Sequence, residues 1–326
     1  MSGEIWIIGE VDDDRLQPSS PGVATLGRAF AGAAGRDAVG VVVGGTPGAA
    51  SAELAGFLPR VLAASIPREG GWLDPADAAR ALATLVEARS PSFVVVPATP
   101  AGRVLAGALA ARLQWGLLTN AVDLEWDGAP LVHTVVFKTD LHISSAFTGD
   151  HGVITVQPNV VRPEALDAPG GVEAVPVDEP AATSGSAVRL VERVRVPAPV
   201  SVEGASVVVA GGAGVGSAGA WSLVDELADA LRGAVGSSRR PVDAGWVPFS
   251  QQIGQTGKSV RPDLYVALGI SGEVQHRVGM RTARTVVAIN QDPDAPIRPF
   301  SDLFVVGDLH AIVPELVASI RARSGG

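Results

Sequence analysis

Short runs of β-branched and other apolar residues recur along this 326-residue chain, and helix-length segments separate them. Such continuous runs are typical of strands buried on both faces of a sheet, and that burial requires parallel strands covered by helices. The runs therefore predict an α/β fold with mainly parallel sheets. The predicted strands are residues 5–8, 38–43, 93–96, 206–210, 264–268, 285–289 and 303–306.

Helix boundary signals support this interpretation. Asp74 can cap a helix whose first position is Pro75, and Ser90 followed by Pro91 ends that helix. Strand 93–96 follows at once. A Pro- and Gly-containing turn then leads into a second predicted helix over residues 103–113.

The chain divides near its middle. Residues 163–186 lose all periodicity and are rich in Pro, Gly, Ala and acidic residues, which is typical of an exposed connection. We place a linker at about 163–187, between an N-terminal domain (1–195) and a C-terminal domain (196–326). Residues 188–196 alternate apolar and charged side chains and predict a half-exposed strand that leads into the second domain. Each domain is expected to have three layers.

Composition excludes several classes of protein. Thirty-four acidic against 25 basic residues give a net charge of −9, which opposes binding to nucleic acid. The absence of cysteine excludes disulfide scaffolds, thiolate-bound zinc and iron–sulfur clusters. His133, His142 and His151 are nine residues apart and share no common face, so no metal site is predicted.

The sequence also predicts a protein that does not itself span a membrane. Its N-terminus lacks the basic region of a secretory signal. The long uncharged stretch 205–224 contains too many glycines and serines for a membrane span and is interpreted as a strand, a loop and a helix start. A cytoplasmic location is expected.

Two glycine motifs each allow more than one interpretation. Residues 211–219 follow a predicted strand and contain G-x-G-x-x-G from Gly214 to Gly219, which permits a phosphate-binding turn, a dinucleotide site or merely a tight strand-to-helix turn. Residues 254–259 resemble the end of a Walker A loop, but Gln252 stands where that motif needs glycine. The many amide and hydroxyl groups of this second segment suit either a polar heterocycle or a solvated turn.

Seven motifs, taken together, carry a resemblance. They begin at Val242, Gly254, Pro262, Gly269, Gln275, Val287 and Val306, and they read VDAG, GQTGK, PDLY, GISG, QH, VAIN and VGDL. In order and spacing over about residues 204–320 they resemble the α subunit of electron-transfer flavoproteins. The N-terminal half is similar to that family only in its α/β pattern and in residues 98–102, which precede a helix.

The resemblance implies a C-terminal FAD-binding domain of the Rossmann-like, DHS-like type and a heterodimer with an electron-transfer flavoprotein β subunit. It implies an electron carrier with no substrate of its own. Electrons would come from a flavin dehydrogenase, typically an acyl-CoA dehydrogenase of fatty-acid β-oxidation, and pass to a quinone oxidoreductase at the membrane. Some members of the family instead bifurcate electrons, and the β subunit decides between these modes.

The resemblance also assigns cofactor-binding residues. Arg239 would stabilise the reduced, anionic ring of the flavin, the Thr256 hydroxyl would donate to its N5, and His276 would raise its potential from beside the pyrimidine carbonyl. Other residues would line the ring, the ribityl chain with the phosphates, and the adenosine. The implied set is Ser238, Arg239, Ile253, Gly254, Gln255, Thr256, Ser271, Gly272, Glu273, Val274, Gln275, His276, Asn290, Asp308 and Leu309.

One position departs from the family pattern. Ala213 stands in the glycine loop where the family usually has arginine, so FAD phosphates are expected to be held less tightly unless Arg277, Arg281 or backbone N–H groups compensate. An alternative function is therefore a non-redox, partner-binding member of the family with weakened FAD binding. An NAD-dependent protein built on Gly214 to Gly219 is a further alternative.

Overall fold

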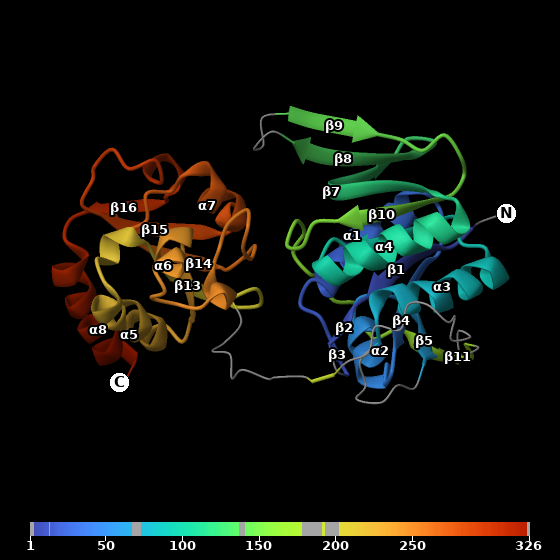
Figure 1. Ribbon diagram of the computed structural model, residues 1–326, viewed down its shortest axis with the longest axis horizontal. Coiled ribbons are helices and arrows are strands. Elements are labelled where there is room, and N and C mark those ends of the chain that lie inside the picture. The colour runs from blue at the N-terminus through green and yellow to red at the C-terminus, as the bar shows by residue number, and fades with distance from the viewer. Residues whose placement is uncertain are drawn as a thin grey trace. The chain divides into compact units, whose positions relative to one another are not determined.

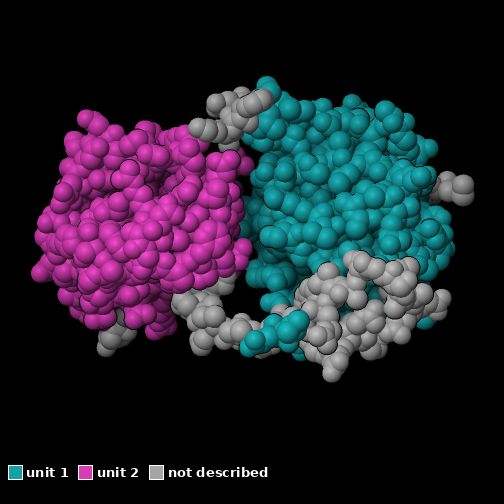
Figure 2. Space-filling model, in the orientation of Figure 1, with its two compact units in different colours: residues 1–194 teal, residues 195–326 magenta. Residues whose placement is uncertain are grey.

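A computed structural model describes residues 3–12, 14–66, 73–136, 141–177, 191–192 and 202–324 of the chain. The chain divides into two compact units, residues 1–194 and residues 195–326 (Figure 2). The predicted strand over residues 188–196 and the second half of the predicted linker fall almost wholly outside the described residues. Each unit is described by itself below.

Unit 1 alternates strands and helices, as its apolar runs predict. The elements are β1 (Ile5–Gly9), β2 (Val11–Asp12), β3 (Arg15–Leu16), α1 (Ser20–Ala33), β4 (Ala38–Gly44), α2 (Gly48–Leu54), β5 (Arg60–Ser65), α3 (Pro75–Arg89), β6 (Phe93–Pro97), α4 (Pro100–Leu113), β7 (Gly116–Trp126), β8 (Pro130–Val136), β9 (Leu141–Ser145), β10 (Gly152–Val156) and β11 (Gly171–Val175).

The predicted caps are present at both helices of the 74–113 segment. The Asp74 side chain accepts a hydrogen bond from the N–H of Ala76, and Ser90 ends α3 in the left-handed conformation. Thr99 caps α4 by accepting from the N–H of Gly102. This helix therefore begins at Pro100, three residues earlier than predicted, because proline is well suited to a first helical position.

The nine-stranded sheet of unit 1 has the order β11-β5-β4-β1-β6-β10-β7-β8-β9. Alternate residues of β1 enter opposite cores, since Ile5 and Ile7 pack in the cluster with α1 whereas Trp6 and Ile8 pack in the cluster with α3 and α4. Helices therefore cover both faces of the sheet (Figure 1). The predicted three-layer α/β fold is confirmed for this unit.

The sheet is not parallel throughout. All pairs from β11 to β7 are parallel, but β7, β8 and β9 form an antiparallel meander at one end (Figure 1). No continuous apolar run predicts this meander, because its strands are only partly buried and carry polar side chains.

Strand β11 corrects the predicted linker, because it lies inside the segment 163–187 that we expected to be an exposed connection. It pairs in parallel with β5 over its full length. Local composition predicted a connection, but backbone pairing with the sheet edge outweighs weak local preference. The connection therefore begins after Val175 and not at residue 163.

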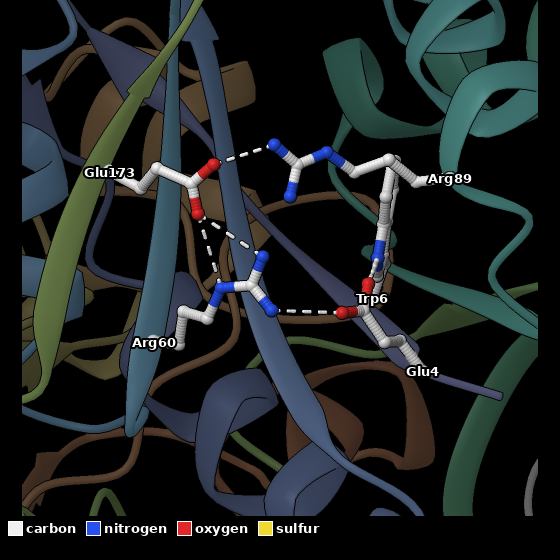
Figure 3. Close-up of polar contacts among 5 residues, drawn as sticks. All are labelled: Glu4, Trp6, Arg60, Arg89 and Glu173. Carbon is white, nitrogen blue, oxygen red and sulfur yellow. Dashed lines mark hydrogen bonds and ion pairs between the residues drawn. The ribbon is translucent and has the colours of Figure 1, made fainter. Parts of the chain in front are cut away.

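Ion pairs hold β11 against the sheet (Figure 3). Glu173 accepts a hydrogen bond from Arg89 Nη2 at 2.6 Å and pairs with Arg60 Nη2 at 3.1 Å. Arg60 in turn pairs with Glu4 Oε1 at 2.9 Å, and Glu4 accepts from the indole N–H of Trp6. Residues from β11, β5, α3 and the start of β1 are thereby linked, although each pair is too exposed to contribute much alone.

Unit 1 has a crossover point between β1 and β6, where β4 lies on one side of β1 and β6 on the other. Glu10 follows β1 at this point and accepts a hydrogen bond from the Thr99 hydroxyl at the start of α4. Its second carboxylate oxygen, Oε2, is buried without a hydrogen-bond partner among the described residues. Burial raises the pKa of Glu10, while hydrogen bonds from the Thr99 hydroxyl and the Gly102 backbone lower it less strongly.

We expect the substitution Glu10→Gln to stabilise unit 1 at neutral pH relative to the wild type, and not at acidic pH. A carboxyl group whose pKa is raised in the folded state is favourable only when protonated, so the wild type loses stability as pH rises through that pKa. Glutamine keeps an acceptor for Thr99 and has no charge to bury. Calorimetry at pH 4.5 and pH 7.5 measures this effect, and an equal difference in melting temperature at both pH values would contradict it.

Unit 2 comprises residues 202–324 of the described chain. Its elements are β12 (Val207–Gly211), η2 (Ala213–Val215), η3 (Ala218–Ala220), α5 (Ser222–Ala230), β13 (Ala234–Ser237), α6 (Arg239–Asp243), η4 (Phe249–Gln251), β14 (Leu264–Leu268), α7 (Val274–Met280), β15 (Thr285–Asn290), η5 (Arg298–Phe300), β16 (Leu303–Val306) and α8 (Leu309–Ser324).

All five strands of unit 2 are parallel, in the order β13-β12-β14-β15-β16. This is the doubly wound order in which the chain reverses direction between its first and third strands, here β12 and β14. Helices α5 and α8 pack on one face of the sheet, and α7 with neighbouring loops packs on the other. The predicted three-layer arrangement is therefore confirmed here too.

The uncharged stretch 205–224 folds as a strand, two short 3-10 turns and the start of α5. That is the interpretation made from its glycines and serines. Among the described residues, every helix is too short or too polar to cross a bilayer.

Candidate functional site

The carboxyl ends of the five strands of unit 2 gather most of the predicted site residues at one edge of the sheet. Ser238 follows β13, residues 269–276 follow β14, Asn290 ends β15 and Asp308 follows β16. Parallel strands place all these positions at the same edge, where open α/β sheets bind ligands. The fold thus brings together residues that are far apart in the sequence.

The glycine loop after β12 packs directly against the loop after β14. The N–H of Gly212 donates to Leu268 O at 2.8 Å, and the N–H of Gly214 donates to Gly269 O at 3.0 Å. A Cβ atom on Gly212 would overlap the Gly269 carbonyl oxygen, and one on Gly214 would lie 2.7 Å from Gly269 Cα. These two glycines therefore allow two backbones to approach closely at the crossover point.

The local structure of residues 211–219 bears on the alternatives for this motif. Gly214 lies in η2 and Gly219 lies in η3, whereas α5 begins only at Ser222. The motif G-x-G-x-x-G therefore does not open a helix, as a dinucleotide fingerprint requires. Of the three alternatives, the geometry thus disfavours the dinucleotide site.

The loop 252–258 is fixed against the start of α7. Gln255 N–H donates to Gln275 O at 2.7 Å. Gly254 has a φ of +143°, and a Cβ there would lie 2.7 Å from the same carbonyl oxygen, so only glycine fits without strain. Lys258 points to Glu203, with Nζ 3.0 Å from Oε2, so it does not act as a Walker A lysine. The loop consequently presents Gln255 and Thr256 to solvent.

Thr256 has a hydroxyl proton available for a ligand. Its Oγ1 accepts a hydrogen bond from Gln252 Nε2 at 3.0 Å, and Gln252 is buried. Since the amide N–H2 is the donor in that bond, the threonine proton is not used by it. From the sequence, Gln252 is only a polar residue of the loop. The structure shows that its side chain orients the Thr256 hydroxyl.

His276 is buried, and both nitrogens of its ring have partners inside unit 2. It is 7% exposed, its Nδ1 lies 3.1 Å from Ile253 O, and its Nε2 lies 2.9 Å from the hydroxyl of Tyr265. Burial lowers the pKa of His276 to about 4, against a smaller opposing effect of the bond to Ile253. The imidazole is therefore neutral at pH 7 with both nitrogens engaged inside unit 2.

Ser238 and Arg239 lie at the start of α6. The N–H of Ser238 donates to Gly211 O at 3.0 Å, which joins the ends of β13 and β12. Arg239 is exposed and its Nε lies 3.1 Å from Asp243 Oδ2 one turn later. An exposed pair of this kind contributes little to stability, so the guanidinium can exchange Asp243 for a ligand at low cost.

The residues assigned to the adenosine end have structural partners of their own. Asn290 donates to Ile270 O at 2.9 Å and accepts from the N–H of Asp292. Asp308 caps α8 by accepting from the N–H of His310 at 2.9 Å. Leu309 is 3% exposed in the core. These contacts explain why Asn290, Asp308 and Leu309 occupy their positions even without a ligand. Of the three, Asp308 is the one that is exposed to solvent.

Residues 271–276 vary in exposure. Ser271, Glu273 and Gln275 are exposed, Val274 is partly buried and Gly272 is buried. Gly272 has a φ of +78°, and a Cβ there would lie 2.6 Å from Ile297 Cα. The turn thus directs its polar side chains outward from the carboxyl edge of β14.

The glycine loop lacks the positively charged side chain that the family pattern places at residue 213. Ala213 is exposed at the start of η2. Of the two arginines named as substitutes, Arg277 stacks on Phe300 with its Cζ 4.0 Å from the ring centroid, and Arg281 is exposed. The loop 211–219 itself therefore carries no charged side chain.

The chemistry of this edge fits a flavin. Neutral donors and acceptors from Ser238, Gln255, Thr256, Ser271 and Gln275 suit a ring system and polyol chain that carry many acceptors and few charges. Metal chemistry has no comparable site, since no group of three His, Asp or Glu side chains in the described part of the chain is arranged to hold an ion.

Comparison with known families agrees with the sequence resemblance. Residues 5–183 match the family model described as electron transfer flavoprotein domain, and residues 201–281 match the model described as electron transfer flavoprotein FAD-binding domain. Together these matches cover most of both units. FAD is thus the cofactor of the domain family to which unit 2 corresponds.

Curated relatives carry the same description along the whole chain. A protein of Mycobacterium tuberculosis named electron transfer flavoprotein subunit alpha is 41% identical over 326 residues, which cover 99% of each chain. Its namesake in Mycobacterium leprae is 45% identical over 250 residues, covering 75% of this chain and 76% of the relative. The Bacillus subtilis namesake is 34% identical, covering 98% of each.

Proposed function

Because this chain belongs to the α-subunit family of electron-transfer flavoproteins, we propose that it binds FAD at the carboxyl edge of the unit 2 sheet, in a heterodimer with a β subunit. Bound FAD would accept and release electrons one or two at a time. The donor would be a flavin dehydrogenase of the acyl-CoA dehydrogenase type, and the acceptor a quinone oxidoreductase.

One observation carries this proposal. The loop 252–258 is hydrogen-bonded to α7 through the Gln255 N–H, yet it leaves Gln255 and Thr256 exposed, with the Thr256 proton free to donate. A surface turn without a ligand has no need for a buried glutamine to orient an exposed threonine. Rigid support beneath exposed donors is typical of a binding site that is formed before its ligand arrives.

Each remaining residue has a role that follows from its surroundings. Arg239 and Ser238 would contact the ring from the start of α6, and the exposed polar side chains of residues 271–275 would contact the ribityl chain and phosphates. Asn290, Asp308 and Leu309 would shape the adenosine end through the loops that they hold in place. His276 would support the loop from beneath.

The test is an absorbance spectrum of the chain co-expressed and purified with a β subunit. We expect a yellow heterodimer that contains FAD and is reduced by an acyl-CoA dehydrogenase with its substrate. A colourless heterodimer that takes up no FAD on reconstitution would contradict the proposal and would favour the non-redox, partner-binding alternative.

We expect Thr256→Val to lower the midpoint potential of the bound flavin. A donor to N5 stabilises the added electron density, and loss of about one hydrogen bond, roughly 1 kcal/mol, corresponds to ~40 mV for one electron. Redox titration of the reconstituted heterodimer measures this shift.

Thr282→Val is the matched control for that experiment. It makes the same substitution in unit 2, but the Thr282 hydroxyl donates to Val260 O and lies outside the loop 252–258. Equal flavin potentials in the two variants would show that Thr256 does not donate to the flavin.

A further inference from the structure

Tyr265 is the single tyrosine of the chain, and its side chain is completely buried in the core of unit 2. It lies in β14, and its hydroxyl is 2.9 Å from Nε2 of His276 in α7. Burying a hydroxyl group costs free energy unless it is hydrogen-bonded, and phenylalanine would fill nearly the same volume without that cost. The phenol group therefore calls for an explanation beyond packing.

The direction of the hydrogen bonds follows from the chemistry of the three groups. The Ile253 carbonyl can only accept, so His276 Nδ1, which lies 3.1 Å away, carries the proton. A neutral imidazole has a single N–H, so its Nε2 accepts and Tyr265 donates. Burial raises the pKa of Tyr265 above its ordinary value, which keeps the phenol protonated and able to donate.

The hydrogen bonds from Tyr265 to His276 and from His276 to Ile253 end at the loop that carries the exposed donors of the site. Ile253 is buried, its N–H donates to Ser237 O at 2.8 Å, and its carbonyl accepts from His276. Gln255 and Thr256 follow within three residues along the same loop. The orientation of the His276 ring thus determines where the base of the loop is held.

We propose that Tyr265 is a positioning residue for the flavin site, since it fixes the Nδ1–H tautomer and the orientation of His276 and thereby holds the loop that presents Gln255 and Thr256. The inference rests on the proposed binding of FAD by this chain. It assigns Tyr265 no contact with the flavin, because the side chain is completely buried.

The test compares Tyr265→Phe with Ser301→Ala in the heterodimer with a β subunit. Ser301 donates to Ile297 O at 3.0 Å in the same unit, so the control also loses one hydroxyl hydrogen bond but leaves the Tyr265–His276–Ile253 chain intact. We expect Tyr265→Phe to raise the dissociation constant of FAD about fivefold, the equivalent of one hydrogen bond, and to change the flavin potential. Ser301→Ala is expected to change neither.

A second readout does not depend on FAD. Long-range 15N–1H spectra of the five histidines are expected to show His276 as a single Nδ1–H tautomer in the wild type and in Ser301→Ala. Tyr265→Phe is expected to shift its Nε2 resonance and to populate the second tautomer. The His276→Asn variant assigns the signal by its loss, and its side-chain amide can still donate to Ile253.

A double-mutant cycle separates positioning from packing. If Tyr265 acts through His276, adding Tyr265→Phe to His276→Asn is expected to change FAD affinity no further. Additive losses, or a Tyr265→Phe variant that matches Ser301→Ala in both readouts, would overturn the inference and leave the proposed function intact. A wild-type heterodimer unable to bind FAD would instead overturn the proposed function, and with it any role of Tyr265 toward the flavin.

Discussion

Replacing Gly212 by alanine is expected to destabilise unit 2 by about 2–3 kcal/mol, the range of an overpacked backbone contact. Gly212 has an extended backbone conformation that any residue can adopt, so its own φ and ψ are not the reason. A Cβ there would overlap the Gly269 carbonyl oxygen and lie 2.8 Å from Ile270 Cα. The loops after β12 and β14 would have to separate at the crossover point, and FAD binding is expected to weaken as well.

The matched control for this prediction is Gly219→Ala in the same loop. The nearest atom to a Cβ at Gly219 is Ser217 Oγ at 3.8 Å, an ordinary contact distance. Urea unfolding without FAD measures the stabilities of both variants, because bound cofactor would stabilise the folded state by mass action. A Gly212→Ala variant as stable as Gly219→Ala would contradict the prediction, because it would show that the loops after β12 and β14 can separate without loss of stability.

Restoring the missing cation is expected to have the largest effect on the cofactor. Ala213→Arg places a guanidinium in the glycine loop, where the family pattern has one and where residues 211–219 of this chain carry no charge. Hydrogen bonds to charged groups contribute about 1.5–3 kcal/mol, and solvent exposure of residue 213 reduces that value. We therefore expect the dissociation constant of FAD to fall about tenfold, equivalent to ~1.4 kcal/mol.

Ala218→Arg distinguishes a local contact from a general effect of charge. Residue 218 is also exposed and lies five positions later in the same loop, so both variants carry the same net charge. Fluorescence titration of each heterodimer with FAD gives the affinities. Equal gains in both variants would show that only long-range charge matters, and no gain in either would place the phosphates away from residue 213.

The outcome of the Ala213→Arg experiment also bears on the function. A wild-type heterodimer that is colourless but binds FAD after Ala213→Arg would indicate a chain that kept the fold and lost the cofactor. A wild-type heterodimer that already holds FAD would show that backbone N–H groups suffice for the phosphates. The proposed function requires the second result.

Continuous apolar runs predicted strands, but they did not find every buried strand: β10, which is buried along its whole length, β5 and β13 lie outside the predicted runs. All seven predicted runs correspond to strands, and Asp74, Pro75 and Ser90 marked the ends of α3 correctly. The antiparallel meander and β11 were not predictable. Their stability comes from backbone pairing with strands distant in the sequence, as when β11 pairs with β5.

The site divides in the same way. Motif order and spacing indicated the family, and most of the residues that the resemblance named lie at one edge of the unit 2 sheet because parallel strands end together there. Only the tertiary structure showed that Asp308 caps a helix, that Asn290 joins two loops, and that His276 is neutral and buried against Tyr265. A residue type specifies which bonds a side chain can make, whereas its charge and partners depend on how completely the fold removes it from water.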